Sequence, residues 1–410
     1  MVTLEVATAT RHHHRHRHRL RVPFVFVGTS STALLLSAIV IVATLTIATI
    51  GKMDVPPQKP SVDYPSIYSH AHHDYQSYQI NKGTSKVAIM GGTGMQGGAA
   101  IDLLLESGAS PSNIRTLTRN ANSPAARRLS KEKGISVLEG SQDIGNEEDP
   151  EYGQKVENLR EAYARLLDGV ECLFALTFTQ FDNSTREKRL GRILFESIAA
   201  SPSIKLVVFS GGERTGIPLL DAKADIEDVG RQVLRSSDTG LRCVFLHSSF
   251  FMENTLIKGN HKRYRLSSDG RRYELSLPLP FDRRIAMISA KDIGNIAAQI
   301  LLNEPFVEEA RFRSLTIVGD IVSPRTLLQS IKMSVTEFEF QYRQTNFDDL
   351  KATMGEAQTT LVRQMYETYY AQNSDENLTR QHIEQTRKIY PKTADIDAWV
   401  KKDGKIILSS

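Results

Sequence analysis

A run of glycines near residue 90 is the first feature of the sequence that could do chemistry. It lies between an apolar run at 86–90 and a segment with helical apolar spacing at 99–106. Glycines at such a junction allow a tight turn, let the backbone approach a pyrophosphate and let the helix pack closely on the strand. The N–H groups and dipole of the helix start also attract phosphate. The junction therefore predicts a dinucleotide-binding turn formed by Gly91, Gly92, Thr93, Gly94, Met95, Gln96 and Gly97.

The residues after the second predicted strand indicate which dinucleotide binds. NAD-binding units usually place Asp or Glu there, on the ribose 2′-hydroxyl. This chain instead has Arg119 and Asn120 after the apolar run 114–118. An arginine can pair bidentately with a 2′-phosphate, which a carboxylate would repel. An ordinary surface arginine is the alternative, but the position favours NADP(H) as the cofactor.

Six short apolar runs alternate with helical patterns between residues 85 and 255. This alternation predicts an α/β fold, a Rossmann doubly wound parallel sheet with helices on both faces. Cys172 and Cys243 lie inside two of the runs, which predicts buried thiols rather than a disulfide framework, and no Cys/His spacing suggests a metal site. The runs are 86–90, 114–118, 135–138, 172–177, 205–210 and 242–247.

The pattern changes after residue 255 and predicts a smaller carboxyl-terminal α+β lobe over 256–404. Asp269-Gly270 separates the runs 264–266 and 273–277, which is typical of a hairpin. We expect this lobe to cover the carboxyl ends of the strands, where open α/β sheets bind ligands. Amphipathic spacing predicts helices at 290–302, 323–334 and 359–371.

The amino-terminal part differs in composition from the rest of the 410 residues. Residues 1–21 form a basic, His- and Arg-rich tail, and 52–84 form a Pro-containing linker. Between them, the thirty residues 22–51 contain no Asp, Glu, Lys or Arg, which is long enough for a single transmembrane helix. A cleaved signal peptide, or a soluble cytoplasmic form that lacks residues 1–52, are the alternatives. The orientation stays open.

The distribution of charge excludes one class of partner. Five arginines and one glutamate in residues 1–22 account for the whole formal net charge of +4. The remaining chain is neutral, so we expect no direct binding to nucleic acid.

Several motifs make the chain resemble the NmrA-like branch of the atypical short-chain dehydrogenases. The resemblance extends from about residue 85 to 404 and implies a Rossmann domain, a small carboxyl-terminal lobe and NADP(H) between them. The motifs are the glycine run, Thr118-Arg119-Asn120, Phe209-Ser210-Gly211, Phe251-Met252-Glu253-Asn254, Tyr273-Glu274-Leu275-Ser276-Leu277-Pro278 and Asp292-Ile293-Gly294.

The resemblance also implies which residues contact the cofactor. The glycine turn would hold the pyrophosphate, and residues after the fourth and sixth strands would lie near the nicotinamide. A lysine that some relatives place four residues after Arg119 is Ser123 here, and the acidic residue expected after Gly140 is Ser141, with Asp143 close by. Beyond the glycine turn, the implied contacts are Arg119, Asn120, Asp143, Thr177, Phe178, Arg189, Lys223, Phe251, Met252, Glu253 and Asn254.

Short-chain reductases carry a Tyr-x-x-x-Lys pair on the helix after the fifth strand. The tyrosine donates a proton and the lysine lowers its pKa. A serine at the end of the fifth strand orients the substrate oxygen in these enzymes. Ser210 occupies that position here and Lys223 occupies the lysine position, so these two are the candidate catalytic residues. The position four before Lys223 is Leu219, which cannot transfer a proton.

Three functions therefore stay open. The first is an NADP(H)-binding redox sensor with a degenerate reductase site, whose affinity for a protein partner changes with cofactor occupancy. The second is an NADPH-dependent oxidoreductase in which a desolvated Lys223 serves alone as acid or base. The third is a membrane-tethered scaffold with vestigial cofactor binding. The missing tyrosine favours the first.

Overall fold

The predicted tail at 1–21, the membrane helix at 22–51 and most of the linker lie outside the described residues. Among the described residues, no helix combines the length and apolar character needed to span a bilayer. The computed structural model describes residues 81–179, 183–237, 240–256, 264–266, 272–303, 311–372 and 375–404.

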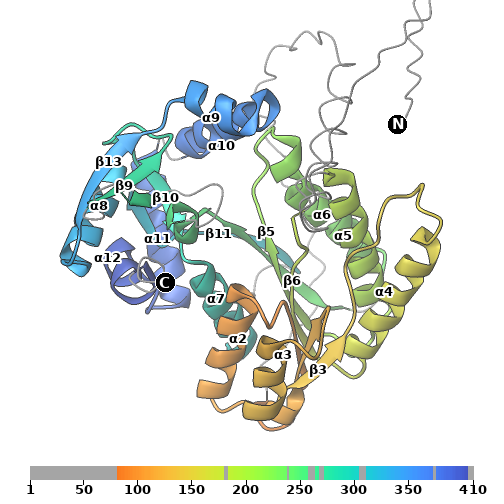
Figure 1. Ribbon diagram of the computed structural model, residues 1–410. Helices are drawn as coiled ribbons and strands as arrows, with labels where there is room; N and C mark the ends of the chain where they lie inside the picture. The colour runs from red at the N-terminus through yellow and green to blue at the C-terminus, as the bar shows by residue number, and fades with distance from the viewer. Residues whose placement is uncertain are drawn as a thin grey trace, which may run out of the picture. The chain divides into compact units, whose positions relative to one another are not determined.

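A seven-stranded parallel sheet forms the centre of the domain (Figure 1). Its strand order is β3-β2-β1-β4-β5-β6-β11, the doubly wound order with one additional edge strand. The predicted parallel Rossmann sheet is confirmed, because all six predicted runs form strands. The seven strands are β1 (Val87–Met90), β2 (Ile114–Thr118), β3 (Ser136–Glu139), β4 (Cys172–Ala175), β5 (Leu206–Gly211), β6 (Arg242–Ser248) and β11 (Phe312–Ile317).

Helices cover both faces of this sheet (Figure 1). The buried residues of α2 (Gly97, Ala100, Ile101 and Leu104) follow helical spacing, so this helix turns one apolar stripe toward the strands. One face carries α2 (Met95–Glu106), α3 (Pro124–Arg127) and α7 (Ala290–Leu302). The other carries α4 (Tyr152–Leu167), α5 (Ser184–Ala199) and α6 (Pro218–Arg235).

Two elements from beyond residue 255 return to the Rossmann layers. Strand β11 pairs in parallel with β6 at the sheet edge, and α7 packs against α2. A Cβ atom on Gly294 of α7 would lie 1.9 Å from the Gln96 backbone oxygen of α2. Only glycine allows this approach, so the carboxyl-terminal segment is built into the core that positions the glycine turn.

Most of the remaining elements contribute to a second apolar core around Trp399, whereas Ile389 of α11 belongs to the core of the parallel sheet. The predicted hairpin is confirmed, since β8 pairs antiparallel with β9. The strands are β7 (Phe250–Phe251), β8 (Tyr264–Leu266), β9 (Arg272–Leu277), β10 (Ile285–Ile288), β12 (Asp320–Val322) and β13 (Glu339–Gln344). The helices are α8 (Pro324–Ser334), α9 (Phe347–Met354), α10 (Glu356–Gln372), α11 (Glu376–Ile389) and α12 (Ile396–Trp399). Short helical turns lie at Pro111–Asn113, Arg128–Glu132, Met252–Leu256 and Val400–Gly404.

Candidate functional site

A cavity of about 1040 Å³ opens at the carboxyl ends of β1, β4, β5 and β6. The glycine turn and the ends of these strands line one side. Residues of α10 and α11, including Tyr369 and His382, line another part of the wall. This is the edge of a doubly wound sheet at which ligands bind, and the volume is at the upper end of the range for small-molecule sites.

The glycine turn is as compact as the sequence predicts. Gly91 has a positive φ of 67°. A Cβ on Gly92 would lie 2.5 Å from Thr116 Oγ1, and one on Gly97 would lie 2.3 Å from the Gly91 carbonyl oxygen. Side chains at these positions would push the strand and helix apart. Glycine is therefore required for the backbone of the turn to line the cavity.

The start of α2 is left open for an anion. Gly94 caps the helix without a side-chain hydrogen bond, and the first turn contains no acidic residue. The first N–H groups of a helix have no partner within the helix. Together with the helix dipole, they form a site that fits a phosphate group.

Two arginines predicted to contact cofactor differ in their surroundings. Arg119 lines the cavity, is exposed and has no hydrogen bond or ion pair with any other described residue. Arg189 does not line the cavity and pairs with Glu147 at 2.5 Å. Of the two, Arg119 is the arginine that offers an available positive charge to a bound anion.

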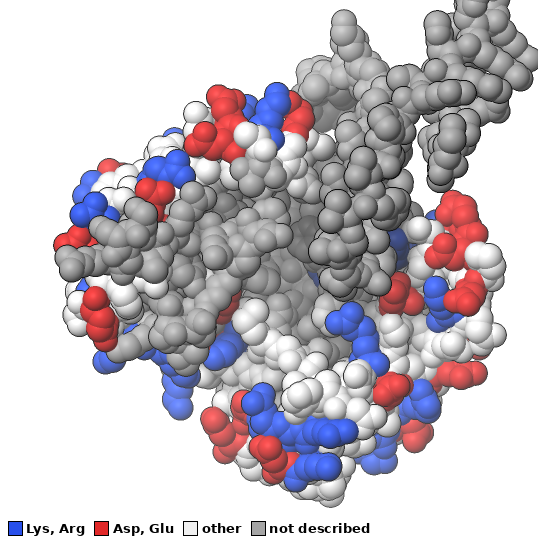
Figure 2. All heavy atoms as spheres, viewed as in Figure 1, with Lys and Arg blue, Asp and Glu red and all other residues white. Residues whose placement is uncertain are grey.

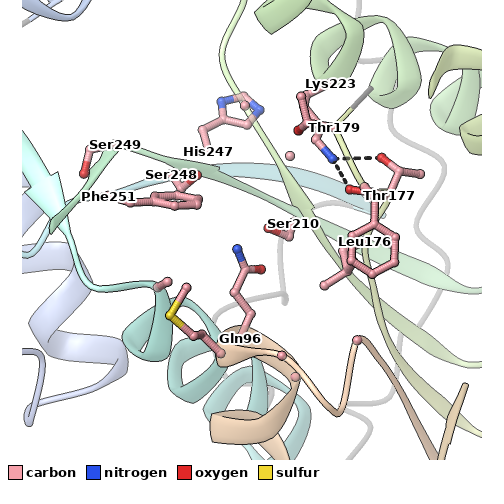
Figure 3. Close-up of a pocket in the computed structure, with 18 of the residues that line it drawn as sticks. Gln96, Leu176, Thr177, Thr179, Ser210, Lys223, His247, Ser248, Ser249 and Phe251 are labelled. Atoms are coloured by element: carbon pink, nitrogen blue, oxygen red, sulfur yellow. Dashed lines mark hydrogen bonds between the residues drawn. The ribbon is translucent and has the colours of Figure 1, made fainter. Parts of the chain in front are cut away.

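Lys223 of α6 is held by a buried network (Figure 3). Its Nζ donates to the Thr177 carbonyl oxygen at 2.5 Å and to Thr177 Oγ1 at 2.8 Å. It also lies 2.8 Å from Glu187 Oε1, and the Glu187 side chain is fully buried. Burial lowers the pKa of Lys223, while the Glu187 carboxylate opposes this shift. An ammonium has three N–H donors, so these three contacts account for all of them.

A second buried pair lies at the end of β6. His247 lines the cavity, and its Nε2 lies 2.7 Å from Glu227 Oε2. The other oxygen of Glu227 accepts hydrogen bonds from Arg231 at 2.7 Å and from Ser314 at 2.6 Å. Burial alone would raise the pKa of Glu227, but these hydrogen bonds hold the pKa below its ordinary value. His247 is therefore fixed against an ionised carboxylate.

Some polar atoms of the cavity wall have no partner in the described chain. Gln96 Oε1, Gln142 Oε1 and Ser249 Oγ are buried without a hydrogen bond, and all three residues line the cavity. The Gln96 side chain extends from α2 into the space between Ser210 and Phe251 (Figure 3). Buried polar atoms are normally hydrogen-bonded, so this part of the wall fits a ligand with polar groups of its own.

Most of the residues predicted as contacts from the sequence come together at this cavity. The predicted residues that line it are Gly91, Thr93, Gly94, Met95, Gln96, Gly97, Arg119, Asn120, Thr177, Phe178, Ser210, Lys223, Phe251 and Asn254. Those that do not line it are Gly92, Asp143, Arg189, Met252 and Glu253.

The residues outside the cavity have structural contacts instead. The Gly92 N–H donates to Thr116 Oγ1 at 3.1 Å, and Met252 is fully buried in the second core. Asp143 Oδ1 accepts from the Gly145 N–H at 3.2 Å. Glu253 accepts from the Ala290 N–H at 3.0 Å, so its carboxylate binds the start of α7 rather than a ligand.

The sequence did not single out several residues that the fold brings to the site. Gln142 lies one residue before the predicted Asp143 and turns inward instead of it. Glu187, His247, Tyr369 and His382 are far apart in the sequence and match no spacing rule. A titratable residue directly after a buried strand, as at His247, is the one signal that could have been noticed.

The chain matches the family model described as the NmrA-like family over residues 83–400. It is similar to NmrA, a negative transcriptional regulator crystallised in complex with NAD, with 16% identity and a TM-score of 0.61 over 78% of this chain and 96% of that chain. The structure of NmrA in complex with NADP gives 15% identity and a TM-score of 0.60 over 78% and 96%.

An enzyme shares the same fold. The triphenylmethane reductase of Citrobacter sp., complexed with NADP(H), is 16% identical, with a TM-score of 0.58 over 77% of this chain and 99% of that chain. The matched family model covers most of the sequence, and the fold agrees with it. The chain belongs to the NmrA-like family.

Proposed function

We propose that this protein binds NADP(H) at the glycine turn and responds to the state of that cofactor as a regulatory module. The open start of α2 fits the pyrophosphate. Arg119, which has no ion pair with another described residue, fits the 2′-phosphate. Related proteins of the same fold were crystallised with NAD, NADP and NADP(H). Bound NADPH would bring a transferable hydride to the site.

The state of Lys223 carries the regulatory side of the proposal. The tyrosine of a short-chain reductase is replaced by Leu219, and the three N–H donors of Lys223 are held by Thr177 and Glu187. To donate a proton to a substrate, Lys223 would have to break one of these contacts beside a fully buried carboxylate. The network supports a lysine that holds the end of β4 in place rather than one that transfers protons.

The described residues on one face of the molecule favour a protein or small-molecule partner over a polyanion. On the face shown in Figure 2, the described Lys and Arg side chains are interspersed with Asp and Glu. One of the similar structures is a negative transcriptional regulator. By analogy, we propose that cofactor occupancy changes the affinity of this protein for a protein partner.

Binding and turnover measured on one preparation test this proposal. The purified full-length chain is titrated with NADPH and NADP⁺ by fluorescence, and NADPH oxidation is then followed with a panel of carbonyl compounds and quinones. We expect saturable binding without oxidation above the background rate. Tyr264 is the first tyrosine after Lys223 in the sequence. Turnover that disappears in Lys223→Ala but persists in Tyr264→Phe would instead establish a lysine-dependent reductase and contradict the regulatory proposal.

The predicted membrane helix at 22–51 completes the proposal as a tether. Thirty residues without a charged side chain support it. We expect the full-length chain, expressed in cells, to stay in the membrane fraction after an alkaline carbonate wash. A variant that lacks 22–51 should be released by the wash, and equal release of both chains would contradict the tether.

A further inference from the structure

The two ends of a bound dinucleotide would lie over different strands of the sheet. In a doubly wound fold, the pyrophosphate lies at the first glycine turn and the dinucleotide crosses the sheet at that point. Because Arg119 follows β2, the adenosine end belongs over β2 and β3. The nicotinamide end then belongs over β4, β5 and β6, where Thr177, Ser210 and His247 line the same cavity (Figure 3).

The oxidised and reduced forms of the cofactor differ in charge at the nicotinamide end. The oxidised ring carries one positive charge and the reduced ring carries none, while the phosphates are the same in both. A site can therefore distinguish the two forms through the charge that it presents beside the ring. The charged groups at this end of the cavity therefore determine whether the site binds the oxidised or the reduced cofactor more tightly.

Most of these groups are balanced within the protein. Lys223 is paired with Glu187, and Glu227 is paired with Arg231. These four groups lie on α5 and α6 and together contribute no net charge. They leave His247 as a group whose protonation adds a full positive charge to the pocket wall.

The other elements packed against β6 contribute few ionisable groups. Glu213, after β5, accepts a hydrogen bond from Thr316 of β11, the residue paired with His247 across the sheet. Across the cavity lie Tyr369 of α10, whose pKa is raised by burial, and His382 of α11. Tyr369 therefore stays neutral near pH 7. Histidine is the side chain whose ordinary pKa lies in this range. Among the described residues that line the cavity, the histidines are His247 and His382.

We propose that His247 determines which oxidation state of the cofactor the site prefers. Protonated His247 places a positive charge at the nicotinamide end and disfavours NADP⁺ relative to NADPH. Neutral His247 does not repel NADP⁺ in this way. Glu227 acts as a positioning residue, since its carboxylate holds the imidazole against the cavity wall at 2.7 Å. The inference rests on the proposed NADP(H) site and adds a proton-dependent selectivity to it.

The test is the ratio of Kd for NADP⁺ to Kd for NADPH, measured on the full-length chain as a function of pH. Histidine is charged below its pKa, so the ratio should rise as the pH falls. We expect a rise of about tenfold between about pH 8 and about pH 5.5, because a unit positive charge near the ring repels only the oxidised form. The 2′-phosphate also titrates in this range, but both forms carry it and its effect cancels in the ratio.

Three variants distinguish the role of His247 from other causes of a pH-dependent ratio. His247→Gln keeps a donor for Glu227 and should make the ratio independent of pH. His247→Arg places a permanent cation there and should hold the ratio at the acidic value of the parent. His382→Gln is the matched control, because it removes the other cavity histidine and should leave the pH dependence intact.

The outcomes distinguish this inference from the proposed function. Binding of both forms with a ratio that does not depend on pH in the parent would overturn the role of His247 and leave the cofactor site standing. A pH dependence that survives in His247→Gln but is lost in His382→Gln would also overturn it. Failure of the parent to bind either form would overturn the proposed function and the inference with it.

Discussion

The two ends of the cavity are built in opposite ways. At the β1 and β2 end, the start of α2 has no side-chain cap, and the charge of Arg119 has no partner among the described residues. At the β4 to β6 end, Lys223 and His247 are each held by a carboxylate. The free N–H groups and the arginine at the first end can bind an anionic ligand. At the second end, the charges are already paired within the protein and need no ligand. This difference is the basis of the proposed NADP(H) site, in which the open end binds the phosphates.

The largest effect should come from placing a negative charge in the open end. Gly94→Asp puts a carboxylate at the helix start, where it would occupy the phosphate position and repel the ligand. We expect affinity for both NADPH and NADH to fall more than about 100-fold, measured by fluorescence titration.

Gly153→Asp is the matched control for this variant. A Cβ on Gly153 meets no atom within 4 Å, so an added side chain has space there. The control should bind as the parent does. Undiminished binding by Gly94→Asp would mean that the dinucleotide lies elsewhere.

Breaking the internal pair at the other end should reduce stability. Lys223→Ala leaves the fully buried Glu187 carboxylate without its cation, which should lower the free energy of unfolding by about 3 kcal/mol in urea denaturation. The double variant Lys223→Met with Glu187→Gln removes both charges and should recover much of the loss. A stability of Lys223→Ala equal to that of the parent would show that the lysine is not tied into the fold.

The charge of Arg119 should separate the two nicotinamide cofactors. Arg119→Glu should weaken NADPH by about 100-fold and NADH by no more than about threefold, because only NADPH carries the 2′-phosphate. Arg189→Glu serves as the control, since Arg189 pairs with Glu147 away from the cavity. Equal losses for both cofactors in Arg119→Glu would assign the arginine another role.

The smallest effect concerns the Glu227 network. The pKa of Glu227 in the folded protein lies below its ordinary value of 4.5, so ionised Glu227 stabilises the fold above that pH. This contribution should be lost as the pH falls through the lowered value. Glu227→Gln should therefore be less stable than the parent by about 1 kcal/mol above about pH 5, with a smaller difference in acid. A difference that does not change with pH would contradict this assignment.

Local patterns were sufficient for the Rossmann sheet. Short apolar runs bounded by glycines and helical segments predicted β1 through β6, and the spacing of α7 predicted its full extent at 290–302. The return of β11 to the sheet edge was not predictable in this way. Strand β11 joins the sheet through packing between segments that are distant in the sequence. Local periodicity does not indicate which edge of the sheet such a strand will pair with.

The site was predictable where a residue acts through its own backbone or position. The glycine turn and Arg119 belong to this group, since strand and turn geometry alone place them. The contacts of Arg189 and Glu253 were not predictable. Arg189 pairs with Glu147 and Glu253 binds the start of α7, and no sequence spacing reveals either partner. For the same reason, the Glu187 and Glu227 partners of the cavity cations emerged only from the folded chain.

A crystal structure of this protein with NADP⁺ tests the central claim most directly. We predict the pyrophosphate within hydrogen-bond distance of the backbone N–H groups of Met95 to Gly97, and the 2′-phosphate paired with Arg119. The nicotinamide should lie over the ends of β4 to β6. A dinucleotide bound with its phosphates away from the start of α2, or with the 2′-phosphate remote from Arg119, would contradict the account.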